Sequence, residues 1–258
     1  MSKLNIGRYA WPASILLCIL VAWQASLQWL QVPKFLMPRP SDISQALSAD
    51  IHNLLFHASV TLQEIVLGFL LAFVAGVITA LALHISSALR SAIFPILVAS
   101  QAIPIIVIAP ILVVLLGFGI WPKLVMVALI CFFPIVVTTT DGLQSADPLM
   151  KRMMATLHGD RWSILRRVEI PGALPLMFSG VRIAATYAAV GAIVGEWSGS
   201  SAGLGFYMQQ NAAALATPRI FAAVLVLCSM SFCLIGIVSF FERMVAPWSP
   251  RLAKTQAR

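Results

Sequence analysis

The chain has 258 residues, 60% of them apolar and only 10% charged, and its formal net charge at pH 7 is +8. Soluble domains carry about 25% charged residues, so the composition excludes an ordinary soluble protein and predicts an all-α polytopic protein of the lipid bilayer. We expect no nucleic-acid partner, because the positive-inside rule accounts for the basic charge. The length leaves no room for a second soluble domain, so residues 1–258 should form a single transmembrane domain.

A transmembrane helix needs about 20 apolar residues, and six segments of the chain meet this requirement. The expected spans are residues 11–30, 60–84, 93–116, 123–139, 178–196 and 220–244. The orientation follows from the basic residues: with both termini in the cytoplasm, every Lys and Arg lies on the cytoplasmic side or at its edge except Lys34, Arg39, Lys123 and Arg219. The positive-inside rule favours this arrangement, which also places a short basic tail, about residues 245–258, in the cytoplasm.

The region after the first span predicts a short helix at the outer surface. Three prolines break residues 31–40, and Ser41 or Asp42 can cap a helix that follows them. Apolar residues recur at helical spacing over residues 43–55. We therefore expect an amphipathic helix lying in the outer interface of the membrane.

The third span contains Pro95, Pro104 and Pro110, and it follows a tight inner loop expected at residues 86–91. Proline removes a backbone hydrogen bond and bends a helix. Within a membrane, the freed carbonyls need a neighbouring group or a water-filled cavity. Two interpretations remain open: the span faces a translocation path, or its bend serves packing.

The fifth span contains Gly191 and Gly195, four residues apart, and is followed by residues 198–219. Such a pair of small residues lets another helix approach closely, and we expect a contact between subunits there. Residues 198–219 are expected to form an outer loop, in part re-entrant.

A charged segment, residues 141–175, separates the fourth and fifth spans. It holds five Lys or Arg and four Asp or Glu residues, while the flanking segments are almost free of charge. Such a segment cannot lie in hydrocarbon, so it must be an ordered loop on one face of the membrane. Its interior is expected to be helical, and Pro171 and Pro175 are expected to close it. This arrangement favours docking to a soluble partner.

The charged segment resembles the cytoplasmic coupling loop of ABC-importer permeases. That family's pattern is Glu-Ala-Ala, three residues, Gly, nine residues, Ile, any residue and Leu-Pro. Aligned on Pro171, this chain places at the patterned positions Arg152, Met153, Met154, His158, Val168 and Ile170. Further segments occur in the family's order and spacing: Phe132-Phe133-Pro134-Ile135, Thr140-Asp141-Gly142-Leu143 and Arg161-Trp162.

The resemblance implies a type I importer permease with about six transmembrane helices in a bacterial inner membrane. It implies two ABC ATPase subunits, which bind ATP and Mg²⁺, a second permease copy, and an external or periplasmic substrate-binding protein. No cofactor is expected on this chain. The residues expected to dock the ATPase are Leu149, Met150, Lys151, Arg152, Met153, Met154, Ala155, Thr156, Leu157, His158, Gly159, Asp160, Arg161 and Trp162.

The sequence argues against an enzyme. A P-loop requires Gly-Lys followed by Ser or Thr, and no lysine here follows a glycine. Residues 199–203 match Gly-x-Ser-x-Gly, but the nucleophile elbow needs a strand-to-helix turn with a His and an acid nearby. Here the match follows a transmembrane helix and is interpreted as a flexible turn. The four cysteines lie in apolar spans and are interpreted as packing residues.

Two carboxylates, Glu64 and Glu196, lie near the outer ends of their spans. An acidic residue in a membrane usually faces a cavity or a partner. Either the two glutamates line the translocation path and contact a polar substrate, or they are solvated helix ends. Gln101, Tyr187 and Trp197 are further candidates for lining the path.

The resemblance also suggests a substrate class. The group resembled comprises importers of nitrate, sulfonates, taurine and thiamine precursors. Within it, Thr61-Leu62-Gln63-Glu64, Val194-Gly195-Glu196-Trp197 and Gly203-Leu204-Gly205 look most like permeases for hydroxymethylpyrimidine-type thiamine precursors. Acidic groups near the path suit an aminopyrimidine better than an anion. The alternatives are a sulfonate, taurine or nitrate importer, and a secondary transporter that works without an ATPase.

Overall fold

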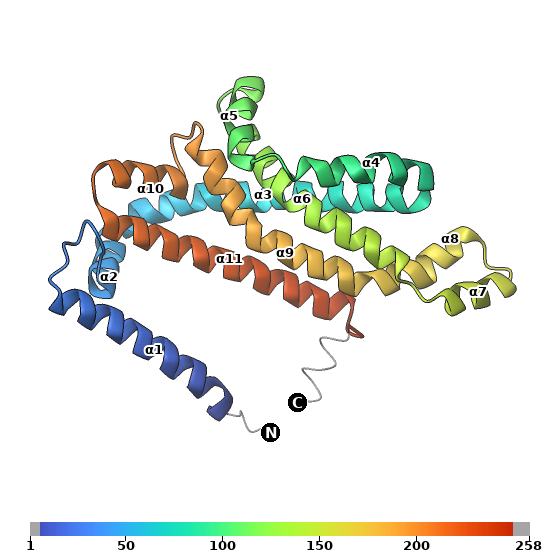
Figure 1. Ribbon diagram of the computed structural model, residues 1–258, viewed down its shortest axis with the longest axis horizontal. Helices are drawn as coiled ribbons and strands as arrows, with labels where there is room; N and C mark the ends of the chain where they lie inside the picture. The colour runs from blue at the N-terminus through green and yellow to red at the C-terminus, as the bar shows by residue number, and fades with distance from the viewer. Residues whose placement is uncertain (1–5, 250–258) are drawn as a thin grey trace.

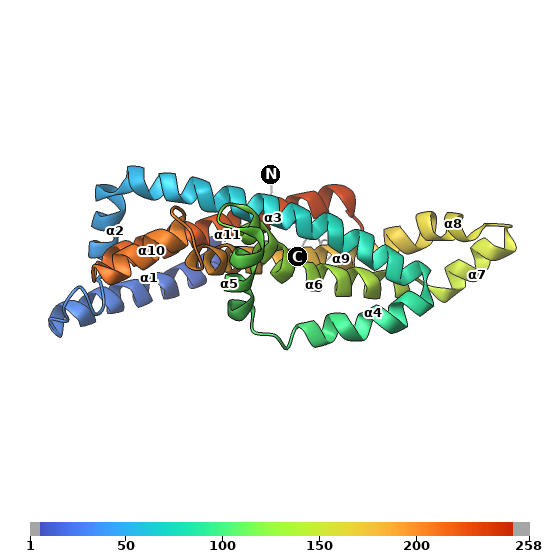
Figure 2. The same ribbon diagram turned by 90° about the horizontal axis from the view of Figure 1, so that it is seen from above.

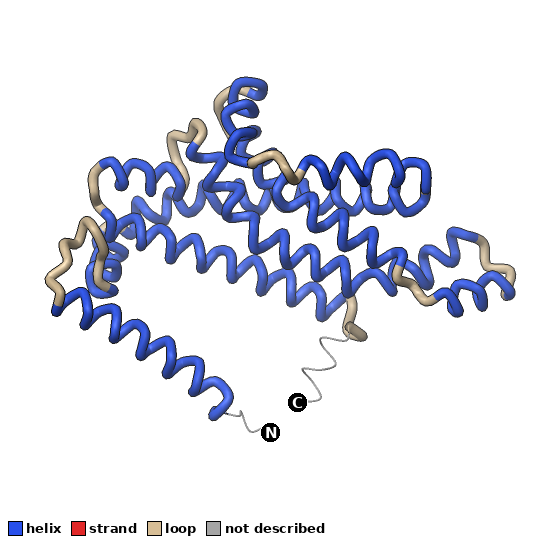
Figure 3. The backbone as a smooth tube through the Cα atoms, viewed as in Figure 1, coloured by secondary structure: helices blue, strands red, loops and turns tan. Residues whose placement is uncertain are grey.

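The computed structural model describes residues 6–249, and every regular element among them is a helix. Four helices are long and apolar enough to cross a membrane: α3 (Ile51–Ile85), α6 (Trp121–Gln144), α9 (Ile170–Trp197) and α11 (Thr217–Val245). They run side by side along the long axis of the molecule (Figures 1 and 3). The all-α fold and the apolar helices predicted near residues 123–139, 178–196 and 220–244 are confirmed.

The first helix, α1 (Ile6–Trp29), stands apart from these four. Its C-terminal part meets α11, where the Trp23 and Phe221 rings lie 6.2 Å apart and Leu27 is buried. Toward the N-terminus it diverges from the bundle (Figure 1). The apolar stretch Ser14–Trp29 is shorter than a full span. Most of the predicted basic tail lies outside the described residues.

The predicted third span is a pair of helices, α4 (Ser87–Ser100) and α5 (Ile105–Leu116), bent by 102° (Figure 2). The bend expected from the prolines is confirmed, and it divides the predicted span 93–116 into two helices. The break falls at Pro104, whereas the other two prolines lie within α4 and α5. The inner loop predicted at residues 86–91 was wrong: Ser86 alone separates α3 from α4, because its hydroxyl accepts a hydrogen bond from the Leu89 N–H and starts the next helix.

The predicted amphipathic helix is divided between α2 (Pro40–Ala49) and the first turns of α3. Arg39, not Ser41 or Asp42, is the N-cap residue of α2. Asp42 stands in the first turn, where its carboxylate accepts a hydrogen bond from the Arg39 N–H at 3.2 Å and pairs with Lys34 Nζ at 2.7 Å. The hydrogen bond from Lys34 holds the pKa of Asp42 below its ordinary value.

Small residues bring α6 and α9 into direct contact. A Cβ atom on Gly191 would lie 2.8 Å from Val127 Cα, and one on Gly195 would lie 3.1 Å from Lys123 Cα. Four alanines of α9 are fully buried in the same core, together with Cys131, a packing residue as expected. The prediction that the glycine pair joins two subunits was wrong, because the helix that approaches it is α6 of the same chain.

Residues 198–219 are not a simple loop. They contain α10 (Leu204–Ala213), whose Leu204 and Tyr207 are fully buried against α3 and α11. The Tyr207 hydroxyl donates a hydrogen bond to Asp50 at 2.8 Å, at the junction of α2 and α3. We call this end of the bundle the α10 end. The opposite end carries α7 (Pro148–Thr156) and α8 (Arg161–Ile164), and we call it the α7 end (Figure 1).

Candidate functional site

The predicted docking residues form a protrusion beyond the α7 end of the bundle (Figures 1 and 2). The carboxylate of Asp147 starts α7 by accepting a hydrogen bond from the Leu149 N–H at 2.8 Å. Asp160 starts α8 in the same way, from the Ser163 N–H at 3.2 Å. Its hydrogen bond to the Ser163 hydroxyl lowers the pKa of Asp160. Side-chain caps encoded in the sequence thus start both short helices of this protrusion.

The first of these helices ends at Thr156, before the last of the expected docking residues. His158, at the position of the family's glycine, adopts the left-handed conformation with φ +58°. That conformation costs a non-glycine residue about 1–2 kcal/mol, and histidine is among the residues that tolerate it. Gly159 follows and comes so close to Met154 that a Cβ atom would lie 2.7 Å from the Met154 carbonyl oxygen.

Pro171 and Pro175 do not close the charged segment, contrary to the prediction. A helix continues from Arg161 to Trp197, and both prolines lie inside it. A π turn, Leu165–Glu169, precedes Pro171. In a regular helix a proline ring clashes with the carbonyl group one turn earlier, and the wider π turn stands at that place. The last two docking residues, Arg161 and Trp162, therefore begin the same continuous helix as the transmembrane segment.

Five large apolar side chains of the docking segment are exposed. Their exposed fractions lie between 58% and 72%, and they belong to Leu149, Met150, Met153, Leu157 and Trp162. Lys151 and Met154 of the same segment are half-buried. Apolar groups gathered on a segment outside the membrane-crossing bundle are typical of a surface that binds another protein.

The docking segment is fastened to the end of α3 by polar contacts that the sequence analysis did not identify. Lys151 Nζ lies 2.8 Å from Glu169 Oε1, and Glu169 Oε2 lies 2.8 Å from His84 Nε2. Arg161 donates a hydrogen bond to the carbonyl of Ile85 at 2.9 Å. The available signal was a histidine in the last turn of an apolar span and a glutamate just before Pro171.

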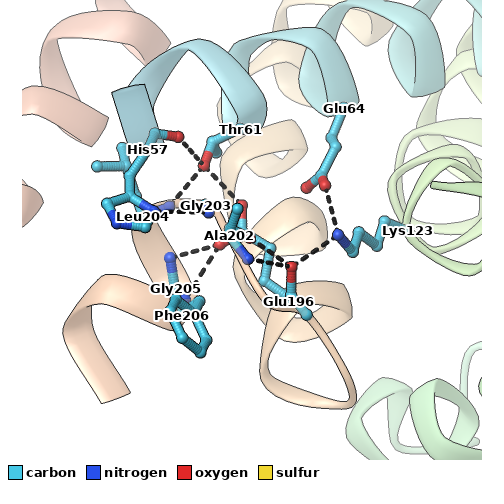
Figure 4. Close-up of polar contacts among 11 residues, drawn as sticks. His57, Thr61, Glu64, Lys123, Glu196, Ala202, Gly203, Leu204, Gly205 and Phe206 are labelled. Atoms are coloured by element: carbon cyan, nitrogen blue, oxygen red, sulfur yellow. Dashed lines mark hydrogen bonds and ion pairs between the residues drawn. The ribbon is translucent and has the colours of Figure 1, made fainter. Parts of the chain in front are cut away.

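Glu196 lies at the α10 end, buried with only 1% of its surface exposed (Figure 4). Its carboxylate accepts hydrogen bonds from the Thr61 hydroxyl at 2.6 Å and from the backbone N–H groups of Gly205 at 2.5 Å and Phe206 at 3.3 Å. These N–H groups belong to the first turn of α10. The positive end of a helix dipole stabilises a carboxylate at this place.

Glu64 is equally buried and pairs with Lys123 of α6 at 2.9 Å (Figure 4). Lys123 also donates a hydrogen bond to the Ser200 hydroxyl at 2.7 Å. The interpretation of Glu64 and Glu196 as solvated helix ends was wrong, since each is only 1% exposed. That they line the path stays a prediction, and in this conformation both are shielded from solvent.

The Gly-x-Ser-x-Gly turn lies against Glu196 and is fastened to α3. Gly203 donates its N–H to His57 Nδ1 at 3.0 Å, and Leu204 donates its N–H to the Thr61 hydroxyl at 2.7 Å. Gly203 has φ +114°, and a Cβ atom there would overlap the Glu196 carboxyl group. The turn therefore holds a buried carboxylate in place, which explains its glycine without a catalytic role.

The other candidates for the path lie on the surface, apart from the buried glutamates. Gln101 is exposed at the break between α4 and α5, and Tyr187 and Trp197 of α9 are 51% and 46% exposed. The sequence analysis missed a second buried ion pair, between Arg182 of α9 and Glu242 of α11. Its signal was two opposite charges in otherwise apolar spans.

Relatives of known type match over most of the chain. A probable ABC transporter permease protein of Haemophilus influenzae is 40% identical, over 86% of this chain and 91% of that protein. The formylaminopyrimidine transport permease protein ThiX of Halalkalibacterium halodurans is 33% identical, over 92% and 95%. The riboflavin transport system permease protein RibX of Chloroflexus aurantiacus is 34% identical, over 95% and 93%. Permease proteins for aliphatic sulfonates of Bacillus subtilis and for taurine of Escherichia coli are 25% identical.

The fold and a family model agree with these relatives. An inward-facing structure of the MetNI methionine ABC transporter superposes with a TM-score of 0.66 at 17% identity, over 76% of this chain and 98% of that one. The family described as the binding-protein-dependent transport system inner membrane component matches residues 72–248. Its members are transport components without catalytic activity. The chain therefore belongs to this family and is the membrane-embedded permease subunit of an ABC importer.

Proposed function

We propose that this permease carries a thiamine-precursor pyrimidine of the hydroxymethylpyrimidine type. The observation that carries the proposal is the ThiX relative, named for formylaminopyrimidine transport, which matches from end to end at 33% identity. The buried groups at the α10 end support it, because they include two carboxylates, and an ion pair to a lysine is made by Glu64 alone. An anionic substrate would be repelled by such a surplus of negative charge.

Competition for uptake tests the substrate. Cells that express the complete importer should take up labelled hydroxymethylpyrimidine, and unlabelled formylaminopyrimidine should compete. Riboflavin, taurine and nitrate should not. Competition by taurine or riboflavin, with none from the pyrimidines, would instead favour the classes named for the other relatives.

We propose further that two copies of the chain pair around the translocation path and that two ATPase subunits, which bind ATP and Mg²⁺, seat on residues 149–162. An external or periplasmic binding protein delivers the substrate. The exposed apolar side chains of α7 support the seating, since they would otherwise remain in water. In this proposal the α7 end and both termini face the cytoplasm of a bacterial cell, and the α10 end faces outward.

Alternating access follows from the continuity of the helix that begins at Arg161. It spans 37 residues, so at 1.5 Å per residue it is about 55 Å long. When the ATPases close on ATP, they pull on α7, and the contacts of Glu169 pass the displacement to α3 and to this helix. The far end of the helix carries Glu196 and the turn that covers it. The path would open outward with ATP and inward after hydrolysis.

The path itself is proposed to run along the surface that carries Gln101, Tyr187 and Trp197. Glu64 and Glu196 would reach a substrate only if the turn at residues 199–203 moved away from them. Replacing Glu64 with Gln tests their part: normal uptake at normal expression would exclude a contact between Glu64 and the substrate.

A further inference from the structure

The break between α4 and α5 exposes irregular backbone inside an otherwise apolar span. The last N–H groups make tight-turn bonds, from Gln101 to Val98 at 3.1 Å and from Ile103 to Ser100 at 3.2 Å, and Pro104 has no N–H to offer. Irregular backbone at membrane depth occurs only where protein buries it or where it lines a water-filled cavity. Among the described residues, α4 has no buried side chain and α5 has one. The break therefore faces the path or the second copy, not lipid.

A cavity of about 180 Å³ lies at this break, between the ends of α4 and α5 and the face of α6. Its polar wall is made by Ser100 and Gln101, and its aromatic wall by Phe132 and Phe133. No lining residue is charged. The Gln101 carboxamide makes no hydrogen bond to any described residue, while Ser100 donates to the Leu97 carbonyl at 2.7 Å and keeps its lone pairs free. A polar wall without partners, set against aromatic rings, is typical of a binding site for a small molecule.

We propose that this cavity is a substrate site within the membrane for one uncharged, single-ring aminopyrimidine. The proposal rests on the proposed function and assigns residues to it. A glutamine side chain offers an acceptor and donors side by side, and it pairs with the ring nitrogen and exocyclic amine of an adenine edge in a bidentate way. An aminopyrimidine presents the same two groups. The phenylalanine rings supply the flat apolar surface on which such a ring stacks.

The dimensions and charge of the cavity exclude the competing substrates. Sites for drug-sized molecules begin at about 300 Å³, so a cavity of about 180 Å³ fits one ring better than a fused three-ring flavin. A sulfonate or nitrate ion would enter without a cation to neutralise it, which is costly in a membrane. The neutral glutamine thus selects a neutral ligand that has a donor and an acceptor on one edge.

The test uses the complete importer, with its ATPase and binding protein, in proteoliposomes and labelled hydroxymethylpyrimidine as the probe. Gln101→Leu removes both hydrogen-bonding groups at nearly constant size, and Gln101→Glu replaces the amide donors with a second carboxyl oxygen. Gln28→Leu is the matched control, since Gln28 is exposed on α1. We expect kcat/KM for uptake to fall about tenfold or more in both Gln101 variants. The control should match the wild type.

A second comparison separates this site from a general loss of transport. A pyrimidine that lacks the exocyclic amine should compete poorly with the probe in the wild type and equally well in Gln101→Leu. Phe133→Leu, which removes one of the two aromatic rings, should weaken uptake while keeping the preference for the amine. If Gln101→Leu does not assemble into the importer, the Phe133→Leu variant still tests the proposed site.

The outcomes distinguish the two proposals. If the wild type carries hydroxymethylpyrimidine and Gln101→Leu carries it equally well with the same preference for the amine, the site is wrong and the function stands. If the wild type carries taurine or riboflavin and no aminopyrimidine, the function is wrong, and the ligand assigned to the cavity falls with it.

Discussion

The exposed side chain of Met153 gives the sharpest test of ATPase docking. It is 63% exposed on α7, and Leu149, one turn earlier, is 72% exposed. Fully burying a Leu or Met side chain contributes about 1.5–3 kcal/mol, so covering these exposed parts contributes about 1–2 kcal/mol each. Met153→Ser should weaken binding of the ATPase about 5- to 30-fold, and Leu149→Ser by a similar factor.

The assay is the affinity of the purified ATPase subunit for the tagged permease in mild detergent. Met37→Ser is the control, because Met37 is 44% exposed but lies in the segment before α2, at the opposite end of the bundle. A helical content equal to that of the wild type would show that the variants still fold. If Met153→Ser and Leu149→Ser bind the ATPase as tightly as the control does, α7 is not the docking surface.

Three further changes probe the polar contacts. Glu169→Gln removes the negative charge that contacts Lys151 and His84 and should lower the uptake per ATP hydrolysed while the ATPase stays bound; an unchanged ratio would exclude coupling through Glu169. Gly203→Ala should lower the melting temperature in detergent, because Gly203 has φ +114° and the new Cβ would overlap the carboxyl group of Glu196. Gly236→Ala is the control: a Cβ there meets no atom within 4 Å, so the melting temperature should stay unchanged or rise. Equal melting temperatures of the two variants would contradict the packing around Gly203. Lys123→Met leaves Glu64 without its cation and should destabilise the protein by about 3–5 kcal/mol. Adding Glu64→Gln should restore much of this stability, and a double variant as unstable as the single one would refute the pairing.

The helices with uninterrupted apolar sequence were predictable. Residues 123–139, 178–196 and 220–244 fall inside α6, α9 and α11, because length and hydropathy alone decide whether a segment crosses a membrane. The family resemblance was also confirmed, and with it the alternative of a secondary transporter fails. The glycine at position 203 and its neighbours were correctly excluded as a catalytic elbow.

The features that escaped prediction depend on contacts between distant residues. Three prolines occur in the third span, and only packing decides that Pro104 is the one at which the helix breaks. From the sequence, Glu196 could be a solvated helix end, because its burial comes from the turn that follows it. That turn folds back over Glu196 and forms hydrogen bonds with α3, more than a hundred residues earlier in the chain. The sequence signal for α10 was weak, because a glycine-rich start is typical of a loop. Only the packing of Leu204 and Tyr207 in the core identifies the segment as a helix.

The close contact between α6 and α9 limits how this permease can move. Without side chains at Gly180, Gly191 and Gly195, the backbone of α9 lies directly on α6, and a shift of one residue in either direction would drive a methyl group or larger into a main chain. The two helices cannot slide past each other, so they form one rigid unit. The docking residues lie at one end of this unit. We therefore expect α6 and α9 to move together, as one rigid unit, during transport.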